Sequence, residues 1–362
     1  MIIGAGTAGL IAAKRISRFG ISTIVYDQKK VPGTPNRASG ILSIKGLDAL
    51  EIGYKKAVTN TLYGARIHTG KETLEIIANK PKAHVLDRKV LNEICMYEAI
   101  DNGAIVNTGV RADHDIVGDY DILVGADGAV SSVAMHFNMG SIKRYVNTYK
   151  AEFEVNVDDA KSVDIIFNSR IANGLFGWMC PNSKEVLEVG IGTIGGNSKR
   201  AFDMFVKDKR VSDVIGRGKV IAEGASMIPL SLREKIVNGE KKVMLVGDAA
   251  GQVKPSTGGG IIFGGNAAII LADVIKKHFE SGMPLYEYSR IYSSRYGLDT
   301  RIHNTVSAMY SKLDKVGFSM AIKVVKLLGI EKFLAKYGDM DMPSNSIGML
   351  FSEVWPHGNK TW

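Results

Sequence analysis

Apolar residues near the start of the chain repeat at helical spacing, with a short apolar run on either side. The repeat ends at Gly20, and the β-branched run 21–26 after it closes on Asp27. A glycine is typical of a helix end, and such a run is typical of a buried parallel strand. The opening therefore predicts a strand, a glycine-rich turn, a helix and a second strand. The repeating helix positions are Leu10, Ala13, Ile16 and Phe19.

The pattern changes twice further along the chain. Positions from about 87 to 102 form another helical repeat, and the run 121–128 closes this first α/β section. Strand-like runs between about 140 and 230 predict a separate antiparallel sheet. The buried run 242–248 then returns to the first pattern and leads into a long helix. The remainder, from about residue 285, has a helical pattern.

These patterns predict an α/β fold in which a discontinuous Rossmann-like domain carries an inserted antiparallel β-sheet domain and a helical C-terminal region. Residues 44–82 are hard to assign and are given mainly to the inserted sheet. The expected divisions are 1–45, 83–138 and 240–284 for the Rossmann-like domain, 46–82 and 139–239 for the sheet domain, and 285–362 for the helical region.

Composition limits the class of protein and its partners. The 362 residues are 45% hydrophobic and 23% charged, as in an ordinary soluble globular protein. The net charge of +9 favours an anionic partner, such as an acidic electron-transfer protein or an anionic membrane surface. No nucleic-acid partner is expected, because no basic run is interleaved with aromatic residues.

Cysteine and histidine spacing exclude some site classes. The two cysteines, Cys95 and Cys180, lie far apart, which excludes a disulfide framework and indicates a reducing, cytoplasmic compartment. No histidine spacing is typical of a metal site, so no metal is expected. We expect no signal peptide and no membrane span. Only three residues precede Gly4, so we expect the natural start to lie a few residues upstream.

The run from Gly4 to Gly9 fits the pattern G-x-G-x-x-G between a strand and a helix. Gly4 permits a tight turn, Gly6 lets backbone approach a pyrophosphate, and Gly9 packs the helix against its strand. Asp27, eighteen residues after Gly9, is placed to accept hydrogen bonds from an adenosine ribose. This combination predicts a dinucleotide site. A second match, 190–195, lacks the following strand and acid, and we interpret it as glycine in a sheet turn.

The segment 246–261 indicates which dinucleotide binds. Asp248 ends a buried strand, where a carboxylate can hold a ribityl hydroxyl. The three glycines 258–260 open a helix, so backbone can reach a flat ring while the helix dipole favours an anionic reduced flavin. A nicotinamide dehydrogenase has no need of this second element. The sequence therefore predicts FAD rather than NAD as the cofactor.

Together with Asp127-Gly128 in mid-chain, these motifs resemble the FAD-binding superfamily of p-hydroxybenzoate hydroxylase. The segment 247–261 is also similar to the geranylgeranyl reductase family, which carries an aromatic-x-Trp-x-Phe-Pro motif followed by G-x-G. This chain has Phe176-Gly-Trp178-Met-Cys180-Pro181 and then Gly190-Ile-Gly192, with Cys180 in place of the usual Phe. The resemblance covers roughly residues 1–275.

The resemblance implies a set of FAD contacts. Arg37 would lie in a loop that wraps the flavin, Arg88 near the cofactor, and Val110 beside the adenine; either arginine could instead be a solvated or salt-bridging side chain. Ala38 stands where several archaeal members have a cysteine, so a thiol role is absent there. The full expected set is Gly4, Gly6, Ala8, Gly9, Asp27, Arg37, Ala38, Ser39, Arg88, Val110, Asp127, Asp248, Pro255, Gly258, Gly259, Gly260 and Ile261.

The family's reaction is the saturation of isoprenoid double bonds, typically in archaeal membrane lipids. The resemblance implies that Phe176, Trp178 and Pro181 line a substrate channel, with Phe176 and Trp178 as ordinary sheet core the alternative; no proton donor is identified. NADPH or a ferredoxin-like protein would reduce the flavin. Two alternatives stay open: a flavin-dependent monooxygenase or halogenase, and an electron-transfer flavoprotein dehydrogenase linked to quinone.

Residues 312–328 carry an apolar stripe that suits either the protein body or a membrane surface. Packing on the body is the favoured interpretation, with lysines expected on the opposite side of the helix. The stripe is Leu313, Val316, Met320, Val324 and Leu327, and the lysines are Lys312, Lys315, Lys323 and Lys326.

Overall fold

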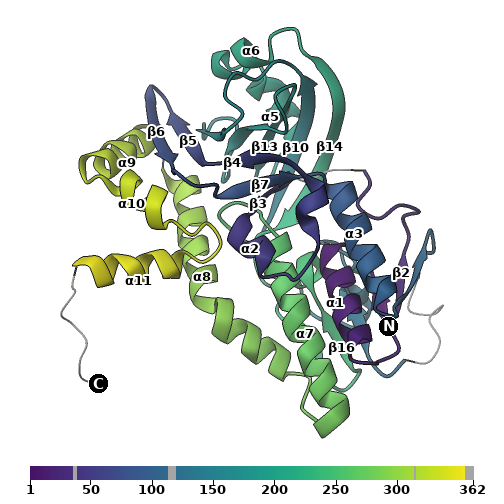
Figure 1. The fold of residues 1–362 in the computed structure, drawn as a ribbon. Coiled ribbons are helices and arrows are strands. Elements are labelled where there is room, and N and C mark those ends of the chain that lie inside the picture. The colour runs from purple at the N-terminus through teal and green to yellow at the C-terminus, as the bar shows by residue number, and fades with distance from the viewer. Residues whose placement is uncertain (36–38, 113–119, 314, 355–362) are drawn as a thin grey trace.

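The computed structural model describes residues 1–35, 39–112, 120–313 and 315–354 (Figure 1). Its centre is a six-stranded sheet assembled from distant parts of the chain. Every neighbouring pair in it is parallel except the edge pair β15–β16. In sheet order the strands are β15 (Val237–Asn238), β16 (Val243–Leu245), β9 (Leu123–Gly125), β1 (Ile2–Ile3), β2 (Ile24–Asp27) and β8 (Ile105–Thr108).

Three helices pack together beside this sheet: α1 (Thr7–Arg18), α3 (Arg88–Asp101) and α7 (Ile261–Ser281). Their buried side chains share one hydrophobic core with the strands, including Leu10, Leu91 and Leu271. Helix α3 begins where Asp87 caps it by accepting hydrogen bonds from the N–H groups of Lys89 and Val90. The prediction of a discontinuous Rossmann-like fold is confirmed.

A seven-stranded sheet forms the second layer. All its neighbouring pairs are antiparallel except β11–β5, so the predicted antiparallel insertion is confirmed with one parallel pair. In sheet order the strands are β14 (Lys219–Pro229), β10 (Tyr145–Glu154), β13 (Val186–Thr193), β12 (Gly177–Pro181), β11 (Ser162–Phe167), β5 (Gly64–Thr69) and β6 (Glu72–Ile77).

The two faces of the seven-stranded sheet have different coverings. On one face, α5 (Ser198–Phe205) and α6 (Lys209–Ile215) bury Phe202, Phe205 and Val211 against apolar strand residues. Residues of the other face share a small core with a three-stranded sheet, which consists of β3 (Ile41–Ser43), β7 (Ala83–Leu86) and β4 (Val58–Leu62). The remaining short elements are α2 (Ile44–Asp48), η1 (Tyr54–Ala57), α4 (Ser132–His136) and η2 (Gly247–Ala250).

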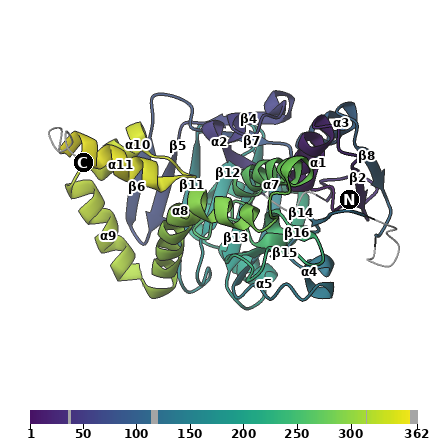
Figure 2. The same ribbon diagram turned by 90° about the horizontal axis from the view of Figure 1, so that it is seen from below.

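In the described part of the chain four helices follow α7, and the last three gather at the end of the molecule away from the N-terminus (Figure 2). The four are α8 (Glu287–Lys312), α9 (Lys315–Leu327), α10 (Ile330–Tyr337) and α11 (Pro343–Val354). Helices α9 and α10 pack against β6 at the edge of the seven-stranded sheet. The helical C-terminal region is therefore as predicted. Within the described ranges, no helix is both long and apolar enough to cross a membrane.

Tyr288 fastens α8 to the parallel sheet. Its buried hydroxyl donates to the Leu245 carbonyl over 3.0 Å and accepts a hydrogen bond from Gln252 Nε2 over 2.7 Å. Burial raises the pKa of Tyr288, so the hydroxyl stays protonated and keeps donating at ordinary pH.

We predict that Tyr288→Phe lowers the free energy of unfolding by about 1–3 kcal/mol, because a buried amide and a buried carbonyl lose a partner. Tyr292→Phe is the control, since the described part of the chain offers the Tyr292 hydroxyl no hydrogen bond and that side chain is also buried. Urea denaturation of both variants measures the difference. Equal losses would show that the Tyr288 hydroxyl bonds contribute nothing specific.

Candidate functional site

The first glycine motif forms a tight turn between β1 and α1. Gly4 has φ +109°, and a Cβ there would lie 2.2 Å from the Ala126 carbonyl oxygen. A Cβ at Gly9 would lie 2.1 Å from the Gly4 carbonyl oxygen, so both positions exclude any side chain. A Cβ at Gly6 would meet nothing within 4 Å. The turn is thus closed against the protein at Gly4 and Gly9 and open at Gly6, beside the uncapped N-terminus of α1.

Asp27 is fixed at the carboxyl end of β2. Its Oδ2 accepts a hydrogen bond from the Ala5 N–H and its Oδ1 accepts one from the Lys29 N–H, both over 2.7 Å. The Val110 N–H donates to the Asp27 carbonyl oxygen over 3.0 Å. Val110 therefore lies beside Asp27 with its N–H already bonded, so its backbone carbonyl is the group that would contact an adenine.

The segment 246–261, called here the second glycine segment, contacts the first glycine segment, Gly4 to Gly9. A Cβ at Gly247 would lie 3.0 Å from the Ala8 Cβ, so the loop that follows strand β16 contacts the start of α1. Asp248 follows in η2, and a Cβ at Gly260 would lie 2.7 Å from Asp248 Oδ1. The glycines 258–260 then lead into α7, whose N-terminus has no side-chain cap. The structure thus brings together two motifs that are far apart in sequence.

Arg88 and Asp248 lie deep in the fold near this junction. Burial lowers the pKa of Arg88 and raises the pKa of Asp248, while their mutual attraction opposes both shifts. Each side chain nevertheless keeps part of its surface accessible. Arg88 Nη2 lies 3.4 Å from the Thr7 hydroxyl oxygen, at the first residue of α1. A cationic and an anionic side chain therefore both lie near the glycine turn, close enough to influence each other's charge.

Three buried polar atoms near this junction have no hydrogen-bond partner: Arg88 Nε, Ser39 Oγ and Asp127 Oδ1. The other carboxylate oxygen of Asp127 accepts hydrogen bonds from the Ser132 hydroxyl and the Val133 N–H. Unpaired buried polar atoms are costly, and a polar ligand is one way to satisfy them. Of the expected cofactor residues, Arg37 and Ala38 fall outside the described residues.

A network that the sequence did not reveal ties the second glycine segment to the C-terminal helices. Lys254 Nζ donates to Asp341 Oδ1 over 2.5 Å, with both side chains about 6% exposed. Asp341 also accepts a hydrogen bond from Ser43, and its carbonyl lies 3.1 Å from His303 Nε2. The pairing joins positions 87 residues apart, which no local pattern could show.

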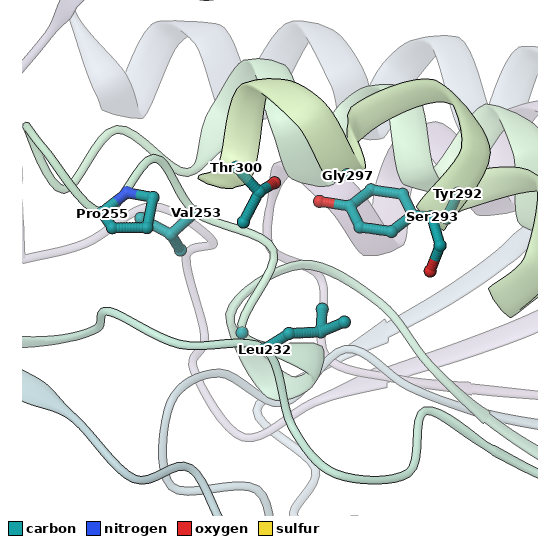
Figure 3. A pocket seen from close by; sticks show the side chains of 8 residues that line it. Leu232, Val253, Pro255, Tyr292, Ser293, Gly297 and Thr300 are labelled. Carbon is teal, nitrogen blue, oxygen red and sulfur yellow. The ribbon is translucent and has the colours of Figure 1, made fainter. Parts of the chain in front are cut away.

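A small pocket lies where residues 251–255 of this segment approach α8 (Figure 3). Of the expected site residues, only Pro255 lines it. Its lining residues are Leu232, Gly251, Val253, Pro255, Tyr292, Ser293, Gly297 and Thr300. The pocket is thus separate from the junction of the two glycine segments.

The Trp178 indole lies against strand β13 of the seven-stranded sheet, in the space left by the missing side chain of Gly190. A Cβ at Gly190 would lie 2.1 Å from Trp178 Cζ2, and one at Gly192 would lie 2.2 Å from Leu175 Cδ2. Both glycines are inside strand β13. The interpretation of the match 190–195 as glycine in a sheet turn is therefore wrong for Gly190 and Gly192, which make room for the side chains of Trp178 and Leu175. Gly195 follows the strand in a bend with φ +72°.

A buried ion pair holds the indole in place. Trp178 Nε1 donates to Glu188 Oε1 over 2.8 Å, and Lys150 Nζ donates to Glu188 Oε2 over 2.7 Å. The Lys150 and Glu188 side chains are 3% and 1% exposed. Burial alone would lower the pKa of Lys150, but Glu188 and Glu152 outweigh it and the pKa is raised. A charged residue in the apolar run 186–193 was the sequence signal for this network.

The expected channel residues divide between two faces. Trp178 of β12 and Phe176, just before this strand, lie on one side of the sheet with their ring centres 6.5 Å apart, while strand alternation puts Pro181 on the other side. Pro181 is therefore dropped from the substrate wall. Burial raises the pKa of Cys180 well above its usual value and that of Cys95 to about 12, so both remain thiols, as packing roles require.

Among the described residues, no group of three or more His, Cys, Asp or Glu side chains is placed to bind a metal ion. The chemistry available at the site therefore rests on the glycine junction with Arg88 and Asp248, and on the aromatic sheet face with its buried ion pair.

We predict that Glu188→Ala lowers the free energy of unfolding by about 3–5 kcal/mol, because it leaves the buried Lys150 ammonium short of an anion. Glu188→Gln, which keeps an acceptor for the indole, should lose less. Replacing both Lys150 and Glu188 with methionine should also lose less than Glu188→Ala alone. Denaturant titration ranks the three variants, and a double variant as unstable as Glu188→Ala would contradict the buried-charge explanation.

No family model matches the chain. It is 30% identical over 332 residues to digeranylgeranylglycerophospholipid reductase 3 of Methanosphaera stadtmanae, covering 82% of this chain and 83% of that protein. In structure it is similar to a geranylgeranyl bacteriochlorophyll reductase-like protein of Thermoplasma acidophilum, with a TM-score of 0.77 and 20% identity over 98% of this chain and 96% of the other.

A flavin-dependent brominase is also similar, with a TM-score of 0.70 and 14% identity over 98% of both chains. Identities this low show a shared fold and no shared reaction. The motifs of the sequence and the match to the Methanosphaera reductase agree, and the chain belongs to the digeranylgeranylglycerophospholipid reductase family.

Proposed function

We propose that this protein is an FAD-dependent reductase that saturates carbon–carbon double bonds in the geranylgeranyl chains of archaeal phospholipid precursors. The observation that carries the proposal is the junction of the two glycine segments, where Gly247 meets Ala8 beside three buried polar atoms without partners. The relative's name supplies the substrate class, a digeranylgeranylglycerophospholipid.

The residues at the junction fit FAD. The open space at Gly6 and the N-terminus of α1 suit the pyrophosphate, and the carboxylate of Asp27 suits the adenosine ribose. Asp248 would hold the ribityl chain, and the backbone of the glycines 258–260 would hold the ring. Arg88 Nε, Ser39 Oγ and Asp127 Oδ1 would gain polar partners from the bound molecule. The bound flavin would supply the hydride that the reduction needs.

The aromatic face of β12 would hold the isoprenoid chain. Phe176 and Trp178 are rigid and apolar, so they would exclude water and keep the chain extended. The bonds from Glu188 to the indole and to Lys150 would fix the orientation of this wall. Residues of this face position the substrate in the proposal, and the proton donor is left unassigned.

The electron donor would be NADPH bound transiently or a ferredoxin-like acidic protein. The net charge of +9 would speed encounter with an acidic donor. A cytoplasmic enzyme acting on a membrane lipid would also have to reach that lipid at the membrane surface.

The direct test is a single-turnover reaction. The purified protein, loaded with FAD and reduced by dithionite without oxygen, is incubated with a geranylgeranylated glycerophospholipid, and the product is weighed by mass spectrometry. The proposal expects a gain of one H₂ for each saturated bond and reoxidised flavin. Unchanged lipid with a flavin that stays reduced would overturn it.

We predict that Asp248→Ala weakens FAD binding about 10- to 100-fold, because a hydrogen bond to a charged group is lost. Fluorescence titration of the flavin-free protein with FAD measures the dissociation constant. Asp101→Ala, on the exposed end of α3, is the matched control and should bind FAD normally. Unchanged affinity in Asp248→Ala would remove Asp248 from the proposed cofactor site.

We predict that Trp178→Ala leaves FAD affinity unchanged but lowers kcat/KM about tenfold or more, because the isoprenoid chain loses an apolar wall. Trp178→Phe should recover part of that loss. Steady-state kinetics on the same lipid, with flavin content measured in parallel, separate the two effects. Normal turnover in Trp178→Ala would make Trp178 a structural residue only.

A further inference from the structure

Helix α9 presents an apolar stripe to solvent. Val316, Met320, Val324 and Leu327 are 63%, 62%, 51% and 85% exposed, and their spacing puts them on one side of the helix. The interpretation that this stripe packs on the protein body is therefore wrong for these four residues. Exposed apolar side chains that cluster in this way typically mark an interaction surface.

The stripe is exposed because α9 uses a different face to pack. Phe318 stacks on Phe167 with ring centres 4.5 Å apart, and Ile322 is buried. This second face packs against β5 and β6 at the edge of the seven-stranded sheet. Helix α9 thus has two apolar faces, of which the sheet covers only one.

The charge around the stripe indicates what kind of partner covers the exposed face of α9. The sequence of α9 contains three lysines and no acidic residue. Lys323 lies three residues after Met320 and four before Leu327, so it borders the stripe and does not oppose it as expected. Its Nζ lies 3.7 Å from Glu72 Oε1 of β6, but the lysine side chain stays 67% exposed. Lys326 and Lys332 are exposed nearby. Apolar residues bordered by lysines complement an anionic lipid surface, whereas a second copy of this basic chain would be repelled.

The face of α9 that packs on the sheet is connected by ring contacts to the proposed substrate wall, Phe176 and Trp178. Phe318 stacks on Phe167, Phe167 lies 5.7 Å from Phe176, and Phe176 lies 6.5 Å from Trp178, between ring centres. Tyr310, at the end of α8, joins the same cluster, with its ring centre 4.9 Å from that of Phe167. A continuous series of rings therefore links α9 to the strand that would hold the isoprenoid chain.

We propose that α9 docks the protein on an anionic bilayer, with the stripe from Val316 to Leu327 inserted at the boundary between headgroups and acyl chains. Lys326 contacts lipid phosphates, and Lys323 exchanges its ion pair with Glu72 for such a contact. Helix α9 lies flat because its 13 residues are too few to cross the membrane. The aromatic cluster beneath α9 then receives the lipid chain. That last step rests on the proposed function, whereas docking itself does not.

Flotation with vesicles tests docking without turnover. The full-length protein is mixed with vesicles of phosphatidylglycerol or of phosphatidylcholine and centrifuged through a density gradient. We expect it to float with the anionic vesicles, to float less in high salt, and to stay at the bottom with the zwitterionic ones. Protein that binds FAD but floats with neither kind would overturn docking and leave the reductase proposal intact.

A paired substitution assigns the surface. Met320→Glu with Leu327→Glu should reduce flotation about tenfold or more. Met135→Glu with Met204→Glu adds the same charge at two other exposed methionines, 62% and 48% exposed, and should float like the unchanged protein. Circular dichroism and FAD affinity verify the fold of both. Equal flotation of the two variants would overturn the assignment to α9. A Met320→Glu, Leu327→Glu variant that floats normally but no longer forms a dimer seen in the unchanged protein would also overturn it, because a second copy of the chain would then cover the stripe.

Activity on two substrate forms separates docking from chemistry. If the protein is a reductase, Met320→Glu with Leu327→Glu should reduce a detergent-dispersed isoprenoid at the normal rate and lose activity on lipid embedded in vesicles. Loss on both forms would contradict a role confined to docking. If no form is reduced while flotation still depends on the stripe, the reductase proposal fails and docking stands.

Discussion

The structure depends on the close approach of two backbone segments, Gly4 to Gly9 and the loop at Gly247, at the carboxyl ends of strands β1 and β16. The Gly4 turn leaves no room for a side chain against Ala126, and the loop at Gly247 reaches the start of α1. Glycine suits both positions, because a Cβ at Gly4 would overlap backbone atoms and Gly247 has φ +67° with Ala8 close by. The same approach collects Arg88, Asp127 and Asp248 from three separate parts of the chain, and a polar ligand at their junction would satisfy the atoms left unpaired.

A second constraint shapes the seven-stranded sheet, whose aromatic side reaches the glycines 258–260 through Ile228. Glycines at 190 and 192 let the Trp178 indole and the Leu175 side chain lie against β13, and the Lys150–Glu188 pair fixes the indole. Buried charges are expensive unless fully paired, so this arrangement favours one orientation of the ring over others. The sheet therefore offers a rigid aromatic surface, which continues through Phe167 to α9.

Sequence patterns predicted what local spacing controls. The turn at Gly4, the strand ending at Asp27 and the helix after Asp87 each follow from residues close together in the chain. The sequence patterns did not identify strands β5 and β6 in the unassigned stretch 44–82, because β5 joins the sheet by pairing with β11 about a hundred residues away, and β6 is attached to it only through β5. The contacts between Lys254 and Asp341 and between Lys150 and Glu188 are equally non-local. The stripe of α9 was visible, but which face would be buried depended on Phe167.

The central claim is that the two glycine segments hold one FAD molecule between them. Its most direct measurement is the flavin content of the purified protein after incubation with excess FAD, removal of free cofactor and release of bound cofactor by acid. FAD equimolar with protein, and little in Asp248→Ala, is the predicted result. Protein that retains no FAD would contradict the claim. Unchanged FAD content in a variant that combines Asp248→Ala with a bulky substitution of Gly6 would contradict it as well.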